Sequence, residues 1–381
     1  MFGEHISSEV IFFFIFYGIT GAVPLMASVY LLLRRGNAFA SGVEPPLRLR
    51  RWAASFFAMA ALGHVWWYLF LIYSCDIQSA CYVVVCMLDC VTLLTTMAGT
   101  LLAMLQDRKR PIWPAFAVMI PFIVFGVLQI LFPKSSFIKM GTIYIMSVYI
   151  LFSVYMVFAV RQYGRWLNDN YADLENKKVW LSQTVFLVCL LLFLLYGFVD
   201  TDTIFILHVI ELVSFALLLW RVETLPQLES PSTQEVSTAL ASDTSIPPSP
   251  QRLTPQPAAP ATIELAQIER LLKEHCVDKQ LYLQHNLSLQ QLAQTVGTNR
   301  YYLSLYFSRQ GITYNTYINN LRVNHFIGRY QELTATGQPI VARELAYESG
   351  FSSYRTFSRA FTQRMGRSVT DWMRDTGNNM P

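Results

Sequence analysis

Long apolar runs alternate with short polar and charged stretches through the first 220 residues of the chain. Each run has about the 20 residues that an α-helix needs to cross the hydrocarbon core of a bilayer. Seven transmembrane helices are expected, at about residues 10–33, 52–73, 80–105, 112–132, 140–160, 179–199 and 203–220. Only residues 200–202 separate the last two runs, so we expect a hairpin there.

Beyond residue 221 the pattern changes twice. Residues 222–262 contain eight of the 17 prolines, among Ser, Thr, Gln and Ala, a composition typical of a disordered linker. Residues 263–381 show short amphipathic patterns, with apolar residues three and four apart, that predict helices. We therefore expect an all-α chain in three parts: a seven-span membrane domain at 1–221, a linker at 222–262 and an all-helical domain at 263–381.

Within the third part, residues 289–309 and 341–364 repeat one pattern. Ala293 precedes Gly297 by four residues, and Ala346 precedes Gly350 by the same spacing. A small residue where two short helices cross, with glycine in the turn between them, is typical of a helix-turn-helix motif. The second helix of each motif would lie in a major groove of DNA, and we expect its N-cap at the residues Thr298 and Ser352.

A longer amphipathic helix is expected between the two motifs, at residues 313–330. Its apolar stripe comprises Tyr314, Tyr317, Ile318 and Leu321. Such a helix would hold two recognition helices about 34 Å apart, one turn of DNA, so that a single chain contacts successive major-groove segments. A homodimer is therefore not required, although it stays open.

Four stretches in this order resemble the DNA-binding domain of AraC/XylS-type transcription regulators. They are residues 303–307 (LSLYF), 317–323 (YINNLRV), 344–351 (ELAYESGF) and 357–366 (FSRAFTQRMG). The resemblance covers about residues 263–374, and it implies two helix-turn-helix motifs joined by one long helix. Val369 stands where the family usually has proline and Phe326 where it usually has alanine; both are packing positions.

The resemblance also implies roles for individual side chains. The expected base-contacting residues are Arg300, Tyr301 and Ser304 in the first recognition helix and Arg355, Thr356 and Arg359 in the second. Arginine suits guanine because its planar fork reaches O6 and N7 together. At the far ends of these helices, Arg309, Arg364 and Arg367 are expected to bind phosphates and so to add affinity without sequence information. The implied partners are double-stranded DNA and RNA polymerase.

The distribution of Lys and Arg predicts the orientation of the membrane domain. The loops after spans one, three and five hold twelve of these residues, and the alternate loops hold only Lys134 and Lys139. Because cytoplasmic loops are enriched in Lys and Arg, we expect the N-terminus outside and everything after Arg221 in the cytoplasm. The bacterial inner membrane is the expected location, with the DNA-binding domain on the side where DNA lies.

Ionisable residues inside the spans are the candidates for sensing, because they are expensive to bury in lipid. They are His64, Asp89, His208 and Glu211. His208 and Glu211 share a helix face and could bind a polar ligand, a proton or a metal; the alternative is that these two residues make hydrogen bonds between helices. Neither a metal site nor a cofactor is predicted.

Cys75 and Cys81 flank the outer loop between spans two and three. An oxidising periplasm would permit a disulfide there, and unpaired thiols are the alternative.

No sequence pattern of an enzyme is present. The chain has no phosphate-cradling glycine loop, Ser/His/Asp order or repeated Cys-x-x-Cys. We predict a membrane-integrated, one-component transcription regulator controlled by a small-molecule or envelope signal. Two alternatives stay open: a transporter or small-molecule receptor fused to a DNA-binding domain, and a regulator whose helices only anchor it in the bilayer.

Overall fold

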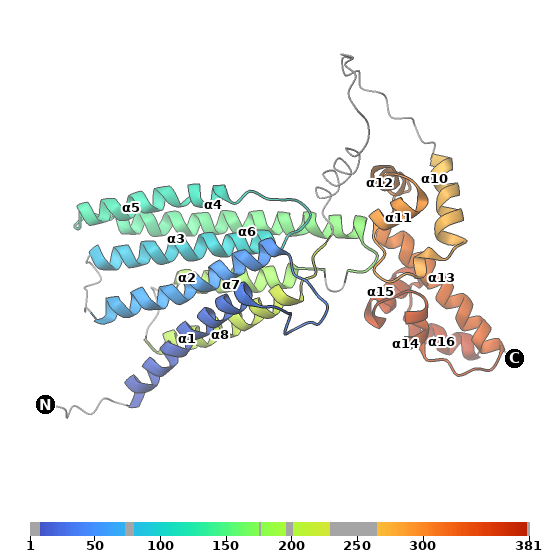
Figure 1. Cartoon of the computed structure of the whole chain (residues 1–381), viewed down its shortest axis with the longest axis horizontal. Helices are drawn as coiled ribbons and strands as arrows, with labels where there is room; N and C mark the ends of the chain where they lie inside the picture. The colour runs from blue at the N-terminus through green and yellow to red at the C-terminus, as the bar shows by residue number, and fades with distance from the viewer. Residues whose placement is uncertain (1–7, 73–79, 175–176, 196–200, 229–264, 379–381) are drawn as a thin grey trace, which may run out of the picture. The chain divides into compact units, whose positions relative to one another are not determined.

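The computed structural model describes residues 8–72, 80–174, 177–195, 201–228 and 265–378 (Figure 1). These residues are helices and connecting turns, without a β-strand, so the prediction of an all-α fold is confirmed. The chain divides into two compact units: Met1–Tyr163 with Val179–Thr238, and Gly164–Lys178 with Ala239–Pro381.

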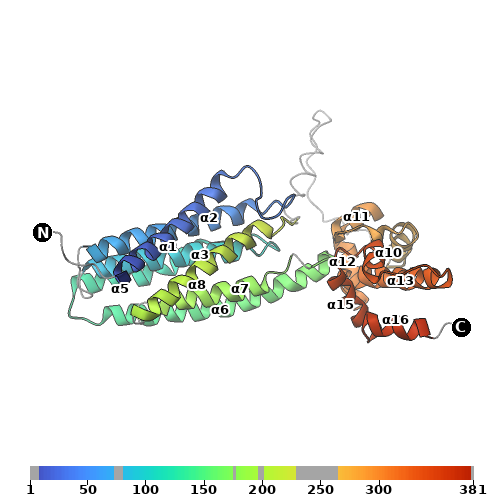
Figure 2. The same ribbon diagram turned by 90° about the horizontal axis from the view of Figure 1, so that it is seen from below.

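The first unit consists of long apolar helices that run side by side (Figures 1 and 2). They are α1 (Ser8–Leu33), α2 (Leu47–Ile72), α3 (Ala80–Ala103), α4 (Trp113–Ala117), α5 (Met119–Leu131), α6 (Phe137–Asn170), α7 (Trp180–Leu195) and α8 (Thr201–Thr224). Each of the seven predicted runs is mostly helical over its described part, with exceptions at the ends of the third, fourth and sixth runs and at Val118 within the fourth. Among the described residues, five helical segments are long and apolar enough to cross a membrane: Phe14–Leu33, Leu47–Phe70, Ala80–Ala103, Trp113–Leu131 and Phe137–Asn170.

The fourth run is two helices rather than one, because α4 and α5 are separated at Val118. Pro121 explains the interruption: it has no N–H to donate to the carbonyl of Ala117, the acceptor that lies four residues before it. The two pieces together still count as one membrane-crossing segment.

Polar contacts join the basic loops to the end of α8. The Arg34 Nη1 atom lies 2.7 Å from Oε2 of the fully buried Glu223. Gln106, just after α3, donates to the carbonyl of Pro226 at 3.0 Å and accepts from the backbone N–H of Leu228 at 2.8 Å. The loops after the first and third spans therefore lie at the same end of this unit as the C-terminus of α8.

The second unit has two hydrophobic cores. The first lies among α10 (Leu265–Leu272), a π-helical turn (Lys273–Val277), a 3-10 turn (Leu281–Leu283), α11 (Leu289–Val296), α12 (Arg300–Arg309) and the start of α13 (Tyr314–Ala335). The second lies among the rest of α13, α14 (Ala342–Glu348), α15 (Tyr354–Met365) and α16 (Val369–Asn378). The pairs α11–α12 and α14–α15 are the two predicted motifs, and α13 joins them.

The N-caps of the recognition helices are one residue later than predicted. Asn299 caps α12, accepting from the N–H of Tyr301 at 2.9 Å, and Ser353 caps α15, accepting from the N–H of Thr356 at 3.2 Å. The expectation of Thr298 and Ser352 was wrong. The N–H of Thr298 instead donates to Ala293, closing the end of α11 after the left-handed Gly297.

Phe326 lies at the centre of the second core. Its ring centroid is 4.4 Å from that of Phe357 and 5.9 Å from that of Phe361, and its side chain is fully buried. Val369 begins α16 and is also buried. Phe326 and Val369, the two residues that depart from the family pattern, are thus both packed in the core.

Arg322 of α13 is fully buried, which the sequence did not suggest. Its Nε donates to the carbonyl of Tyr282 at 2.7 Å, its Nη2 donates to the carbonyl of Gln284 at 2.8 Å, and the guanidinium lies over the Phe351 ring. Burial lowers the pKa of Arg322 to about 10. Because Phe351 belongs to the second core and Tyr282 to the first, this side chain links the two cores.

The second unit also contains the end of α6 and the residues that follow it. Ala172 is fully buried in the first core. Its carbonyl accepts from Nδ2 of Asn315 at 2.6 Å and from Nδ2 of Asn319 at 3.2 Å, and Tyr171 forms an antiparallel bridge with Ser288. The connection between α6 and α7 is therefore packed against α11 and α13.

Candidate nucleic-acid interface

The recognition helix α12 has one apolar and one polar side. Leu303 and Phe307 are buried in the first core, while Tyr301 is 67% exposed and Ser304 is exposed. This separation follows from the helical period, because residues three and four apart share a face. Tyr301 and Ser304 are available to a ligand that approaches α12 from outside the core.

Arg300, at the start of α12, is half-buried, unlike the arginines of the second recognition helix. Its pKa is lowered by burial and raised by the neighbouring Tyr171. The first base-contacting candidate is therefore partly covered in this structure.

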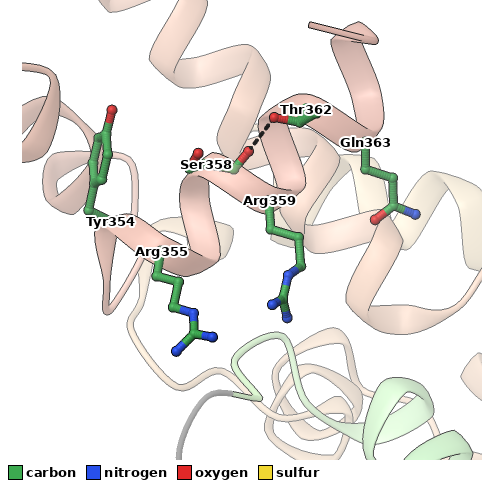
Figure 3. A pocket seen from close by; sticks show the side chains of 6 residues that line it. All are labelled: Tyr354, Arg355, Ser358, Arg359, Thr362 and Gln363. Carbon is green, nitrogen blue, oxygen red and sulfur yellow. Dashed lines mark hydrogen bonds between the residues drawn. The ribbon is translucent and has the colours of Figure 1, made fainter. Parts of the chain in front are cut away.

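The polar face of α15 is more open. Arg355 and Arg359 are one turn apart, both exposed, and extend to the same side of the helix (Figure 3). They line an open hollow of about 630 Å³ together with Tyr354, Ser358, Thr362 and Gln363. On the opposite face, Phe357 and Phe361 are fully buried. The other four lining residues were not predicted from the sequence: Gln363 continues the row of the two arginines at a spacing of four, and Tyr354, Ser358 and Thr362 form the neighbouring row.

Thr356 is less accessible than the neighbouring Arg355. It is half-buried, and its hydroxyl lies 3.1 Å from that of the N-cap Ser353. The hydroxyl thus takes part in the cap, and the methyl group is the remaining part that could contact a base.

Arg309, Arg364 and Arg367 are all exposed. Arg364 Nη2 donates to Oδ1 of Asn324, and Arg367 Nη1 lies 3.0 Å from Oδ2 of Asp375. Exposed pairs of this kind contribute little free energy, so a phosphate can replace these partners.

The charged residues of the two recognition helices are all positive. α12 and α15 contain five arginines and no Asp or Glu. Uniform positive charge on exposed helix faces favours a polyanion, because neutralised phosphates release their counterions.

In the first unit, three of the four candidate sensing residues come together. His64 of α2 and both His208 and Glu211 of α8 have ligand atoms within 4.8 Å of one another. Asp89 of α3 instead accepts from Nε1 of Trp67 at 2.9 Å. Cys81 is half-buried in α3, but Cys75 lies outside the described residues, so their pairing stays a prediction.

Comparison with known proteins identifies the second unit. A family model described as a helix-turn-helix domain matches residues 292–375, from within α11 to within α16. No curated protein and no solved structure matches the chain. The matched region contains most of the first motif, the whole of the second, the joining helix and the arginine-bearing faces described above. The C-terminal part of this chain is a DNA-binding helix-turn-helix domain of the AraC type.

Proposed function

We propose that this protein is a membrane-integrated, one-component transcription regulator that binds DNA sequence-specifically through α12 and α15. The observation that carries the proposal is the pair of recognition helices joined by α13, with exposed arginines and no acidic residue on either. The apolar helices of the same chain supply the membrane anchor.

The side chains divide by role. Arg355 and Arg359 are the principal base contacts, because they are exposed, one turn apart and without an ion-pair partner in the part of the chain that is described. Arg300, Tyr301, Ser304 and Thr356 complete the base-contacting set. Arg309, Arg364 and Arg367 bind phosphates and fix the register of the domain on DNA. RNA polymerase is the expected protein partner.

The membrane domain is oriented with the N-terminus outside and α8 ending in the cytoplasm. Arg34, Asp107 and Arg110 gather near the end of α8, which supports a common side for these loops. Lys and Arg mark that side as cytoplasmic.

Binding by variant proteins tests the assigned roles. DNA is selected from a random pool by the full-length protein in detergent, and affinities are measured by fluorescence anisotropy over a range of salt concentrations. Arg355→Ala and Arg359→Ala should each lose about 1–3 kcal/mol, and the loss should be confined to particular base pairs. Arg364→Ala should weaken binding to every sequence and reduce the salt slope by about 1.

The matched control is Arg270→Ala, which removes an exposed arginine of α10 outside both motifs. It should leave affinity and salt slope unchanged. If the three interface variants lose affinity equally on all DNA sequences, the division into base-contacting and phosphate-binding arginines is wrong.

A second candidate is a small-molecule receptor or transporter fused to the DNA-binding domain. The convergence of His64, His208 and Glu211 within the first unit favours it over a plain anchor. Solute flux into proteoliposomes would support transport. If regulation stays intact after the helices are exchanged for an unrelated membrane anchor, the first unit serves only as an anchor.

A further inference from the structure

The polar cluster of the first unit joins two helices that are far apart in the sequence. His64 lies on α2 and is half-buried; His208 and Glu211 lie on α8, where His208 is buried and Glu211 half-buried. Their ligand atoms all lie within 4.8 Å of one another, and the imidazole centroids are 6.2 Å apart. Two imidazoles and a carboxylate therefore face one small space.

The hydrogen bond of His64 defines which of its nitrogens can bind a cation. Nδ1 lies 2.9 Å from the carbonyl oxygen of Ala60. Because a carbonyl only accepts, Nδ1 carries the hydrogen in the neutral ring and the lone pair is on Nε2. A backbone carbonyl on the second nitrogen is the usual arrangement around a metal-bound histidine, since it fixes the tautomer and the ring orientation.

Helix α1 holds the two imidazoles from a third side. The Tyr17 ring centroid is 5.0 Å from that of His64 and 5.8 Å from that of His208, and the Tyr17 hydroxyl donates to the backbone carbonyl of His64 at 2.9 Å. At Gly21 an added Cβ would lie 3.2 Å from Cβ of His64. The glycine therefore permits the close approach of α1 to His64.

The donor set selects the kind of ion. Two histidine nitrogens and one carboxylate are a known ligand set of zinc sites that keep a fourth position open, whereas Ca²⁺ and Mg²⁺ prefer oxygen ligands. A divalent ion would also offset the cost of a carboxylate inside a membrane span.

We propose that His64, His208 and Glu211 bind one divalent transition-metal ion of the Zn²⁺ type within the membrane domain. The ion would tie α2 to α8, the helix that leads to the C-terminal part of the chain. The binding of the ion does not depend on the proposed function, whereas the role of the ion as the regulating signal rests on it.

Metal titration of the purified full-length protein in detergent tests the site. Zn²⁺ affinity is measured by calorimetry, and Co²⁺ is added as a spectroscopic probe whose visible absorption reports coordination. We expect one ion per chain, a loss of affinity of at least tenfold in His64→Ala, His208→Ala and Glu211→Gln, and no heat from Mg²⁺ or Ca²⁺. His275→Ala, in the second unit, is the control that should retain Zn²⁺ binding.

Glu211→Gln preserves shape and keeps the test informative if an alanine variant does not fold, as judged by size-exclusion chromatography. Equal Zn²⁺ affinity in wild type and Glu211→Gln, or no Zn²⁺ binding by folded wild type, would overturn the site. DNA affinity measured on the same preparation separates this outcome from a failure of the proposed function.

Discussion

Gly297 and Gly350 occupy equivalent turns but have different surroundings. Both have left-handed backbones, with φ of +75° and +88°. A Cβ added at Gly297 would meet nothing within 4 Å, whereas one at Gly350 would lie 2.7 Å from the carbonyl oxygen of Leu283. The second turn therefore requires glycine for its space as well as for its φ.

We predict that Gly350→Ala destabilises the second motif more than Gly297→Ala destabilises the first. The left-handed backbone costs about 1–2 kcal/mol in both variants, and Gly350→Ala must also displace the backbone at Leu283. Hydrogen exchange of α14–α15 and α11–α12 amides in the full-length protein measures the two free energies of opening. Equal losses of opening free energy in the two motifs would contradict the close packing at Gly350.

Individual residues also show where sequence analysis stops. Two residues that can cap a helix stand in succession before each recognition helix, at Thr298–Asn299 and at Ser352–Ser353. Which of the two becomes the N-cap depends on backbone hydrogen bonds that close the preceding helix. The burial of Arg322 could not be predicted from the sequence, because arginine on a helix is ordinarily exposed. The burial of Ala172 depends on contacts with Asn315 and Asn319, more than 140 positions later.

At the scale of elements, α13 contributes to two separate cores. Tyr314 and Ile318 pack in the first, whereas Val323, Phe326 and Tyr330 pack in the second. The division explains how one helix supports both motifs while each motif keeps its own apolar interior.

Phe326→Ala should therefore open the second motif alone. Removal of a fully buried aromatic side chain costs about 3–5 kcal/mol, so amides of α14 and α15 should lose protection while those of α11 and α12 keep it. Phe307→Ala, in the first core, should give the reverse pattern. Loss of protection in both motifs from either variant would mean that the two cores unfold as one.

The positions of the helices were largely predictable because the apolar period is strong. The seven runs and both motifs follow from it. The meeting of His64 with His208 and Glu211 was not predictable, because neighbouring helices in a bundle are set by packing rather than by sequence order. For the same reason the pattern located the arginines of α15 but not the shape of the surface that they line.

For the whole molecule, DNA binding by a membrane-held chain requires a defined membrane orientation. A fluorescent protein fused after Leu228 should fold in the cytoplasm, and alkaline phosphatase fused there should be inactive; a phosphatase fusion at Lys134 should be active outside. This follows from the twelve Lys and Arg on one set of loops against two on the other. The opposite pair of activities would place the DNA-binding domain on the wrong side of the membrane.

The central claim is that a membrane-held chain binds specific DNA sites in the cell. Its most direct test is chromatin immunoprecipitation of the tagged full-length protein beside the Arg355→Ala/Arg359→Ala double variant, with Arg270→Ala as the control. The account predicts discrete peaks for wild type and Arg270→Ala that vanish in the double variant, with equal amounts of all three proteins in the membrane fraction. Peaks that persist in the double variant, or no peaks with wild type over many growth conditions and with Zn²⁺ supplied or withheld, would contradict it.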